Sequence, residues 1–119
     1  MLTIFNKQNS NKASDVESNL KPMTLESAKE YYKAVDISTV KNRTPAIVVG
    51  KVISTRLVPM AKSFWFEVII DDNTGKIDGW FFGRKEIKGM GLGSIVLMKG
   101  LAQMDNGEMT IANPYYQIL

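Results

Sequence analysis

The chain has 119 residues and a formal net charge of +3, and it contains neither cysteine nor histidine. The composition therefore excludes disulfides, zinc sites built on Cys or His, Cys nucleophiles and His general bases. No apolar run approaches the roughly 20 residues that a membrane helix needs, and the first residues become polar too soon for a signal peptide. We expect a single cytoplasmic domain, with no cofactor and no enzymatic activity.

The N-terminal third is expected to contain a tail and a helix. Residues 1–22 are predicted to be a flexible tail, because residues 6–21 are polar and hold few large apolar side chains. Residues 23–45 are predicted to be a helical extension, with Thr24 as N-cap of a helix that runs to Val35. Its apolar side chains recur at helical spacing: Leu25, Ala28, Tyr32 and Val35. This stripe is expected to pack on the rest of the domain, although docking of a second subunit is the alternative.

The remaining residues, 46–119, have the pattern of five short strands. The expected strands are 47–58, 64–71, 76–82, 94–104 and 108–118. Asp72-Asn73-Thr74-Gly75 and Asp105-Asn106-Gly107 predict hairpin turns, and Pro59–Ser63 predicts a loop. Gly50 and Gly100 predict bends within their strands.

Two further features complete this pattern. The segment Arg84–Lys88 predicts a short helix between the third and fourth strands. Asn113-Pro114 predicts a turn or edge feature in the last strand. Three strands, a short helix and two more strands, with glycine bends in the first and fourth, form the order of a five-stranded OB-fold barrel.

A resemblance to a known family supports this interpretation. Residues 47–119 resemble the OB-fold wedge domain of RecG-family helicases, and the chain is also similar to small stand-alone bacterial OB-fold proteins with a Gly83-Arg84-Lys85 step. The matching segments are Val49-Gly50-Lys51-Val52, Asp72-Asn73-Thr74-Gly75-Lys76-Ile77, Trp80-Phe81-Phe82, Gly93-Ser94-Ile95-Val96, Lys99-Gly100 and Asn113-Pro114-Tyr115-Tyr116. The resemblance implies an OB-fold and nucleic-acid binding. It does not imply helicase activity, since the chain has no phosphate loop.

The candidate binding surface is the outer face of the second and third strands. Strand alternation places Trp65, Trp80 and Phe82 there, where bases could stack on them, together with Glu67 and Asp78. The side chains expected to bind phosphates are all basic: Lys51, Arg56, Lys62, Arg84, Lys85 and Lys99.

These residues predict a module that binds single-stranded DNA or RNA with little sequence preference. The alternative is a protein-interaction module, in which the same aromatic side chains form a homodimer contact or lie under the N-terminal helix. The adjacent carboxylates Asp71 and Asp72 point to opposite faces of a strand, so turn chemistry explains them better than a metal site.

Overall fold

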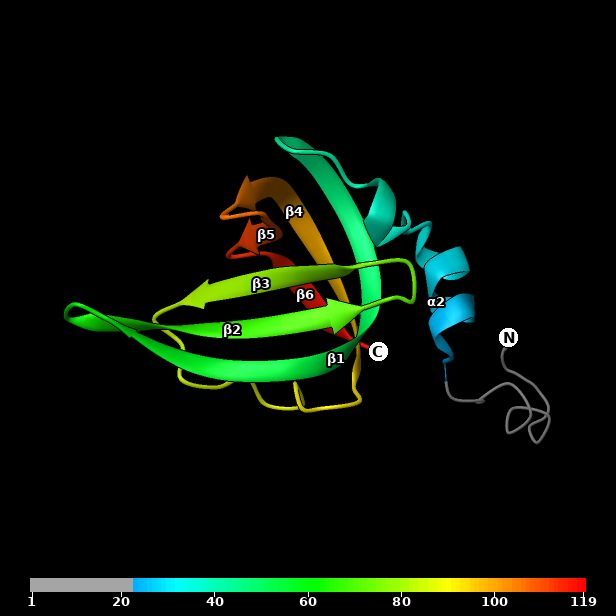
Figure 1. The fold of residues 1–119 in the computed structure, drawn as a ribbon. Coiled ribbons are helices and arrows are strands. Elements are labelled where there is room, and N and C mark those ends of the chain that lie inside the picture. The colour runs from blue at the N-terminus through cyan, green and yellow to red at the C-terminus, as the bar shows by residue number, and fades with distance from the viewer. Residues whose placement is uncertain (1–22) are drawn as a thin grey trace, which may run out of the picture.

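The computed structural model describes residues 23–119, and the tail predicted for residues 1–22 lies outside the described residues. The chain forms the elements α2 (Leu25–Tyr32), η2 (Ile37–Thr39), β1 (Thr44–Met60), β2 (Ser63–Asp71), β3 (Lys76–Phe82), β4 (Ile95–Asp105), β5 (Glu108–Ala112) and β6 (Tyr115–Ile118) (Figure 1). No helix in residues 23–119 has the length and apolar character to span a membrane.

Five strands close into a ring in the order β1-β2-β3-β5-β4, and β4 returns to pair with β1. The β3–β5 pairing is parallel and the others are antiparallel. The sixth strand, β6, adds to the free edge of β4. Strand order and closure are those of an OB-like fold, so the sequence-based prediction of a mostly β protein of this type is confirmed.

Strand β1 belongs to both halves of the ring because it bends in the middle. Residues 44–51 pair with β4 and residues 51–60 pair with β2, with a bulge between Val52 and Ser54. Gly50 lies at the change of partner, and a Cβ there would come within 3.0 Å of the Ile70 Cβ and 3.1 Å of the Asp71 backbone. The predicted bend at Gly50 is thus a point where two strands approach too closely for a side chain.

The β1–β2 hairpin is longer than predicted and projects beyond the rest of the barrel (Figure 1). Only Ala61 and Lys62 form its turn, so the predicted loop at residues 59–63 is wrong. Ala61 has a φ of 50°. A residue in this left-handed region allows a two-residue hairpin turn, which extends both strands to the tip. The Asn106-Gly107 turn between β4 and β5 follows its prediction, with φ values of 52° and 82°.

The segment between β3 and β4 contains no helix, so the helix predicted at residues 84–88 is wrong. Gly83, Gly89 and Gly93 all have positive φ, and this interrupts any helical run. Between them, Ile87 and Met90 are buried in the barrel core. Because these two apolar side chains insert into the core, the segment crosses the end of the barrel without forming a helix.

The single last strand predicted for residues 108–118 is in fact two strands, β5 and β6, separated at Asn113-Pro114. Asn113 has a φ of 47°. Its N–H donates to the Trp80 carbonyl at 2.6 Å, and its side-chain oxygen accepts from the Phe82 N–H at 2.9 Å. The break therefore fastens the end of β5 to β3.

Helix α2 packs on the outer side of the ring, against β1 and β4. Thr24 forms a capping box with Ser27, as its predicted N-cap role requires. Ala28 is buried against Val49 and Leu97. The helix ends at Lys33 with a φ of 55°, before the predicted end, and leaves Val35 exposed. The stripe thus covers the barrel, and the alternative in which this helix covers Trp80 and Phe82 is wrong.

A buried carboxylate joins the helical segment to the barrel. Asp72 accepts hydrogen bonds within its turn from Thr74 and Gly75, and outside it from the Ile37 N–H at 2.9 Å and the Lys29 ammonium at 3.0 Å. Burial alone would raise the pKa of Asp72, but these bonds outweigh it and lower the pKa to about 2. The predicted turn chemistry is present and also holds residues 29 and 37 in place.

Candidate nucleic-acid interface

Three aromatic side chains gather on the outer face of β2 and β3, and we call them the aromatic cluster: Trp65, Trp80 and Phe82. The antiparallel register places Trp65 opposite Phe82 and Trp80 opposite Glu67. The Trp65 ring meets Trp80 at 6.2 Å and Phe82 at 5.0 Å between centroids, edge to face in both cases. The tryptophans are half-buried and Phe82 is exposed, so one part of each indole packs on its neighbour while the rest faces solvent.

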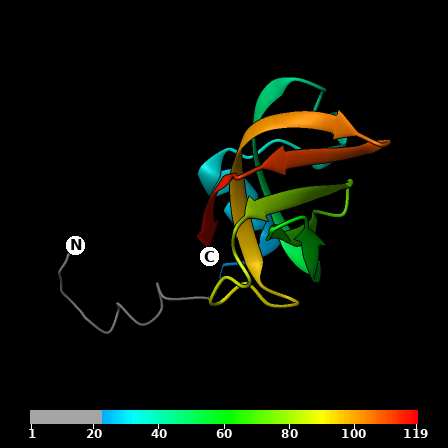
Figure 2. The same ribbon diagram turned by 90° about the vertical axis from the view of Figure 1, so that its left-hand side faces the viewer.

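The two tryptophans line a groove of about 500 Å³. Its walls come from the β1–β2 hairpin on one side and the β4–β5 hairpin on the other, which Figure 2 shows as separate arms of the barrel. Besides Trp65 and Trp80, the groove is lined by Asn42, Arg43, Val58, Met60, Gln103, Met104, Asp105, Thr110 and Ala112. The surface predicted from strand alternation is therefore a concave site between two hairpins.

Carboxyl groups lie beside the aromatic cluster, as predicted, but they are buried. Glu67 and Asp78 are only 4% and 5% exposed. Arg56 reaches across from β1 and pairs with Glu67 at 2.8 Å. Burial raises the pKa of Asp78 to about 7, and hydrogen bonding and charge from Glu67 and Glu108 add to the shift. The raised pKa favours the uncharged form of Asp78, which reduces the negative charge of this face.

The predicted phosphate-binding residues do not share one surface. Arg56 lies on the aromatic face, and Lys62 lies at the tip of the hairpin that carries Trp65. Arg84 and Lys85 are exposed in the loop after β3, and the Lys85 ammonium lies 5.4 Å from the Phe64 ring centroid. Phe64 neighbours Trp65 in β2, so its side chain points to the opposite face of the strand. Lys85 is thus outside the groove.

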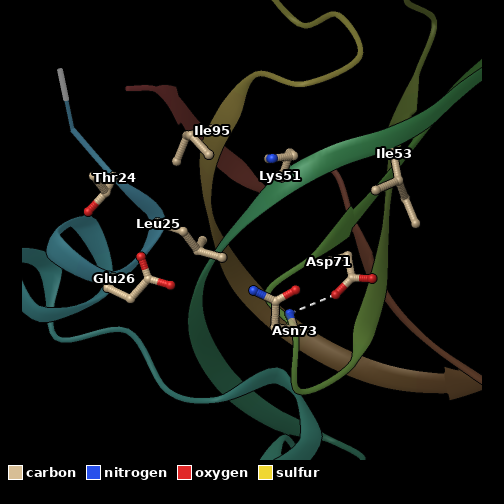
Figure 3. A pocket seen from close by; sticks show the side chains of 8 residues that line it. All are labelled: Thr24, Leu25, Glu26, Lys51, Ile53, Asp71, Asn73 and Ile95. Atoms are coloured by element: carbon tan, nitrogen blue, oxygen red, sulfur yellow. Dashed lines mark hydrogen bonds between the residues drawn. The ribbon is translucent and has the colours of Figure 1, made fainter.

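Lys51 and Lys99 are farther away. Lys51 pairs with Asp71, whereas Trp65 pairs with Val58, so at ~3.3 Å per residue about 23 Å of strand separates Lys51 from the position opposite Trp65. Lys51 lines a second pocket, of about 400 Å³, between the start of α2 and the β2–β3 turn (Figure 3). Lys99 is exposed on β4, two residues from Leu97, which packs under α2.

Sequence reasoning missed several residues of the groove, above all Arg43, Met60 and Met104. Arg43 precedes β1 and had no predicted role. Met60 and Met104 are about half exposed at the groove, and neither had a predicted role in binding. All three residues lie near a predicted hairpin turn or the start of a strand. Their sequence positions point to the groove only once the two hairpins are known to face each other.

The comparisons with known proteins agree with this fold. No protein-family model and no curated protein matches the chain. Among solved structures, the chain is similar to the replication factor A related protein from Methanobacterium thermoautotrophicum, determined by solution NMR. The similarity has a TM-score of 0.54 at 19% sequence identity, and it covers 72% of this chain and 90% of that chain. It shows a shared OB-like fold, and the resemblance to the RecG wedge domain stays a prediction.

Proposed function

We propose that this protein binds single-stranded nucleic acid with little sequence preference and carries out no catalysis. The observation that carries the proposal is the pair of half-buried tryptophans in a groove between two hairpins of an OB-like barrel. OB-folds bind oligonucleotides on this face, and stacking on aromatic rings accepts every base. The fold shared with a replication factor A related protein is in keeping with this role.

In this proposal, bases stack on the aromatic cluster and phosphates meet the cations that border it. Arg56 and Lys62 are the predicted cations that lie nearest to the cluster. Lys51 and Lys99 lie on other parts of the barrel, so we assign them at most a long-range electrostatic effect, which salt would screen. Arg84 and Lys85 could contact phosphates only if the bound nucleic-acid strand continued past the end of β3.

The test is to replace each tryptophan by alanine and measure the affinity for a labelled mixed-sequence single strand by fluorescence anisotropy. We expect Trp65→Ala and Trp80→Ala each to weaken binding roughly 5- to 150-fold, because stacking contributes about 1–3 kcal/mol per base. The matched control is Tyr115→Ala, since Tyr115 is an exposed aromatic side chain on β6, which pairs with β4 and with no other strand of residues 23–119. Unchanged affinity in both tryptophan variants, with the fold intact, would refute the proposal.

One observation favours a second function, a protein-interaction module. Met60, Phe82 and Met104 are each about half exposed at the groove or in the aromatic cluster beside it, and aromatic and methionine side chains are enriched at protein interfaces. A homodimer formed through this face would bury Phe82 and both tryptophans. Sedimentation of the isolated chain separates the two proposals, because a strict monomer at high micromolar concentration that still binds the single strand excludes the homodimer.

A further inference from the structure

We propose that Arg43 binds a backbone phosphate of single-stranded nucleic acid and fixes how the strand lies across the aromatic cluster. This inference rests on the proposed function and adds a residue that the sequence did not single out. Among residues 23–119, Arg43 is the one Lys or Arg side chain that lines the groove. A cation at that position faces the same space as the two tryptophans.

The backbone at Arg43 is in an unusual conformation and is held there from both sides. Its φ is 64°, in the left-handed region that glycine adopts without cost. The Arg43 N–H donates to the Ala102 carbonyl at 2.7 Å, and the Met104 N–H donates to the Asn42 side-chain oxygen at 2.8 Å. The Thr44 hydroxyl donates to the Lys41 carbonyl at 2.6 Å. The turn is therefore fixed to β4, one wall of the groove.

The guanidinium of Arg43 forms no ion pair within residues 23–119, although Asp105 lines the same groove. Arg56, in contrast, is held by Glu67. Arg43 is thus the cation of the groove whose donors are available for a phosphate, which a guanidinium can bind through two parallel hydrogen bonds.

Arg43→Gly tests this inference, because it removes the guanidinium while retaining the positive φ. Lys33→Gly is a matched control, since Lys33 is also an exposed cation at positive φ, with a φ of 55°, but it ends α2 outside the groove. Both variants lose one positive charge, and both should melt at or above the temperature of the unmodified protein. Arg43→Asn provides a second neutral variant, because asparagine tolerates this conformation better than most residues.

We expect Arg43→Gly and Arg43→Asn to weaken binding of the labelled single strand about 10-fold at low salt, as the loss of one charge-assisted hydrogen bond predicts. The slope of log affinity against log salt should fall by about 0.7, the value for one phosphate on a single strand. Lys33→Gly should change affinity less than 2-fold.

The outcomes separate this inference from the proposed function. If the tryptophan variants weaken binding but both Arg43 variants bind as tightly as Lys33→Gly, Arg43 is not a phosphate ligand and the proposed function stands. If all three lysine and arginine variants weaken binding equally, net charge is the cause and the inference is overturned. If the unmodified protein does not bind the single strand at low salt, the proposed function itself fails.

Discussion

Replacing Asp78 by asparagine should stabilise this protein, and the gain should depend on pH. Asp78 is buried, and its pKa is about 7 in the folded chain against an ordinary value of 3.8. Between these two values the folded state binds a proton that the unfolded state has released, so stability falls as pH rises from about 4 to about 7. Below pH 4 both states are protonated and this loss disappears.

The expected magnitude follows from the two pKa values. The difference between 3.8 and about 7 corresponds to a loss of about 4 kcal/mol in the free energy of unfolding at pH 8. Asparagine carries no charge and its amide can donate to Glu67, as the protonated carboxyl can. We therefore expect Asp78→Asn to raise the free energy of unfolding by about 2–4 kcal/mol at pH 8 and by less than about 1 kcal/mol at pH 4.

Urea unfolding followed by tryptophan fluorescence, at intervals from pH 4 to pH 8.5, measures this difference directly. Taking the difference between variant and unmodified protein at each pH cancels the titration of groups that both share. The control is Asp105→Asn, because Asp105 is exposed on the neighbouring hairpin. A stability difference for Asp78→Asn that is the same at pH 4 and pH 8, or a loss of stability at pH 8, would refute the reasoning.

Three other predictions follow from the same structure. Affinity for a single strand should fall as pH rises through about 7 in the unmodified protein, and titration of Asp78→Asn at the same pH values should give a flatter profile. Asp72→Asn should lower the free energy of unfolding by about 2–4 kcal/mol at pH 7, because it weakens a buried ion pair and a hydrogen-bond network; an unchanged urea midpoint would contradict this. Gly50→Ala should lower the free energy of unfolding by about 1–3 kcal/mol, because its Cβ would press on the backbone of β2. Gly91→Ala is the control and should leave stability unchanged, since nothing lies within 4 Å of its Cβ. Equal shifts of the melting temperature in the two variants would argue against the contact at Gly50.

The sequence predicted the strands well because their signals are local. Alternation placed Phe66, Val68 and Ile70 inward and Trp65 outward, and the Asn-Gly step placed the β4–β5 turn. The errors lie where a distant contact decides the backbone. The residues after β3 have helix-forming composition, yet Ile87 and Met90 anchor in the core and prevent the helix. No local pattern shows those anchors.

The candidate site was predictable only in part for a similar reason. Strand alternation found the aromatic cluster, because all three residues lie on two adjacent strands. The grouping of cations depends on how loops from distant parts of the chain meet, and the sequence grouped Lys51 and Lys99 with residues from which the fold separates them. Arg43 was missed for the converse reason: its hydrogen bond to Ala102 brings it to the groove across 59 residues of sequence.

The buried carboxyls constrain how a nucleic acid could lie in the groove. Glu67 and Asp78 flank the aromatic cluster on β2 and β3, and among residues 23–119 Glu67 forms an ion pair, with Arg56, whereas Asp78 forms none. A phosphate placed over Asp78 would meet like charge whenever that carboxyl is ionised, and above pH 7 this is most of the time. In the proposed complex, the uncharged rings of the bases would lie over this region and the phosphates would lie nearer Arg43. In the proposed complex, stacking and charge would favour the same orientation of the nucleic-acid strand, so the Arg43 and Asp78 variants should change affinity in opposite directions at pH 8.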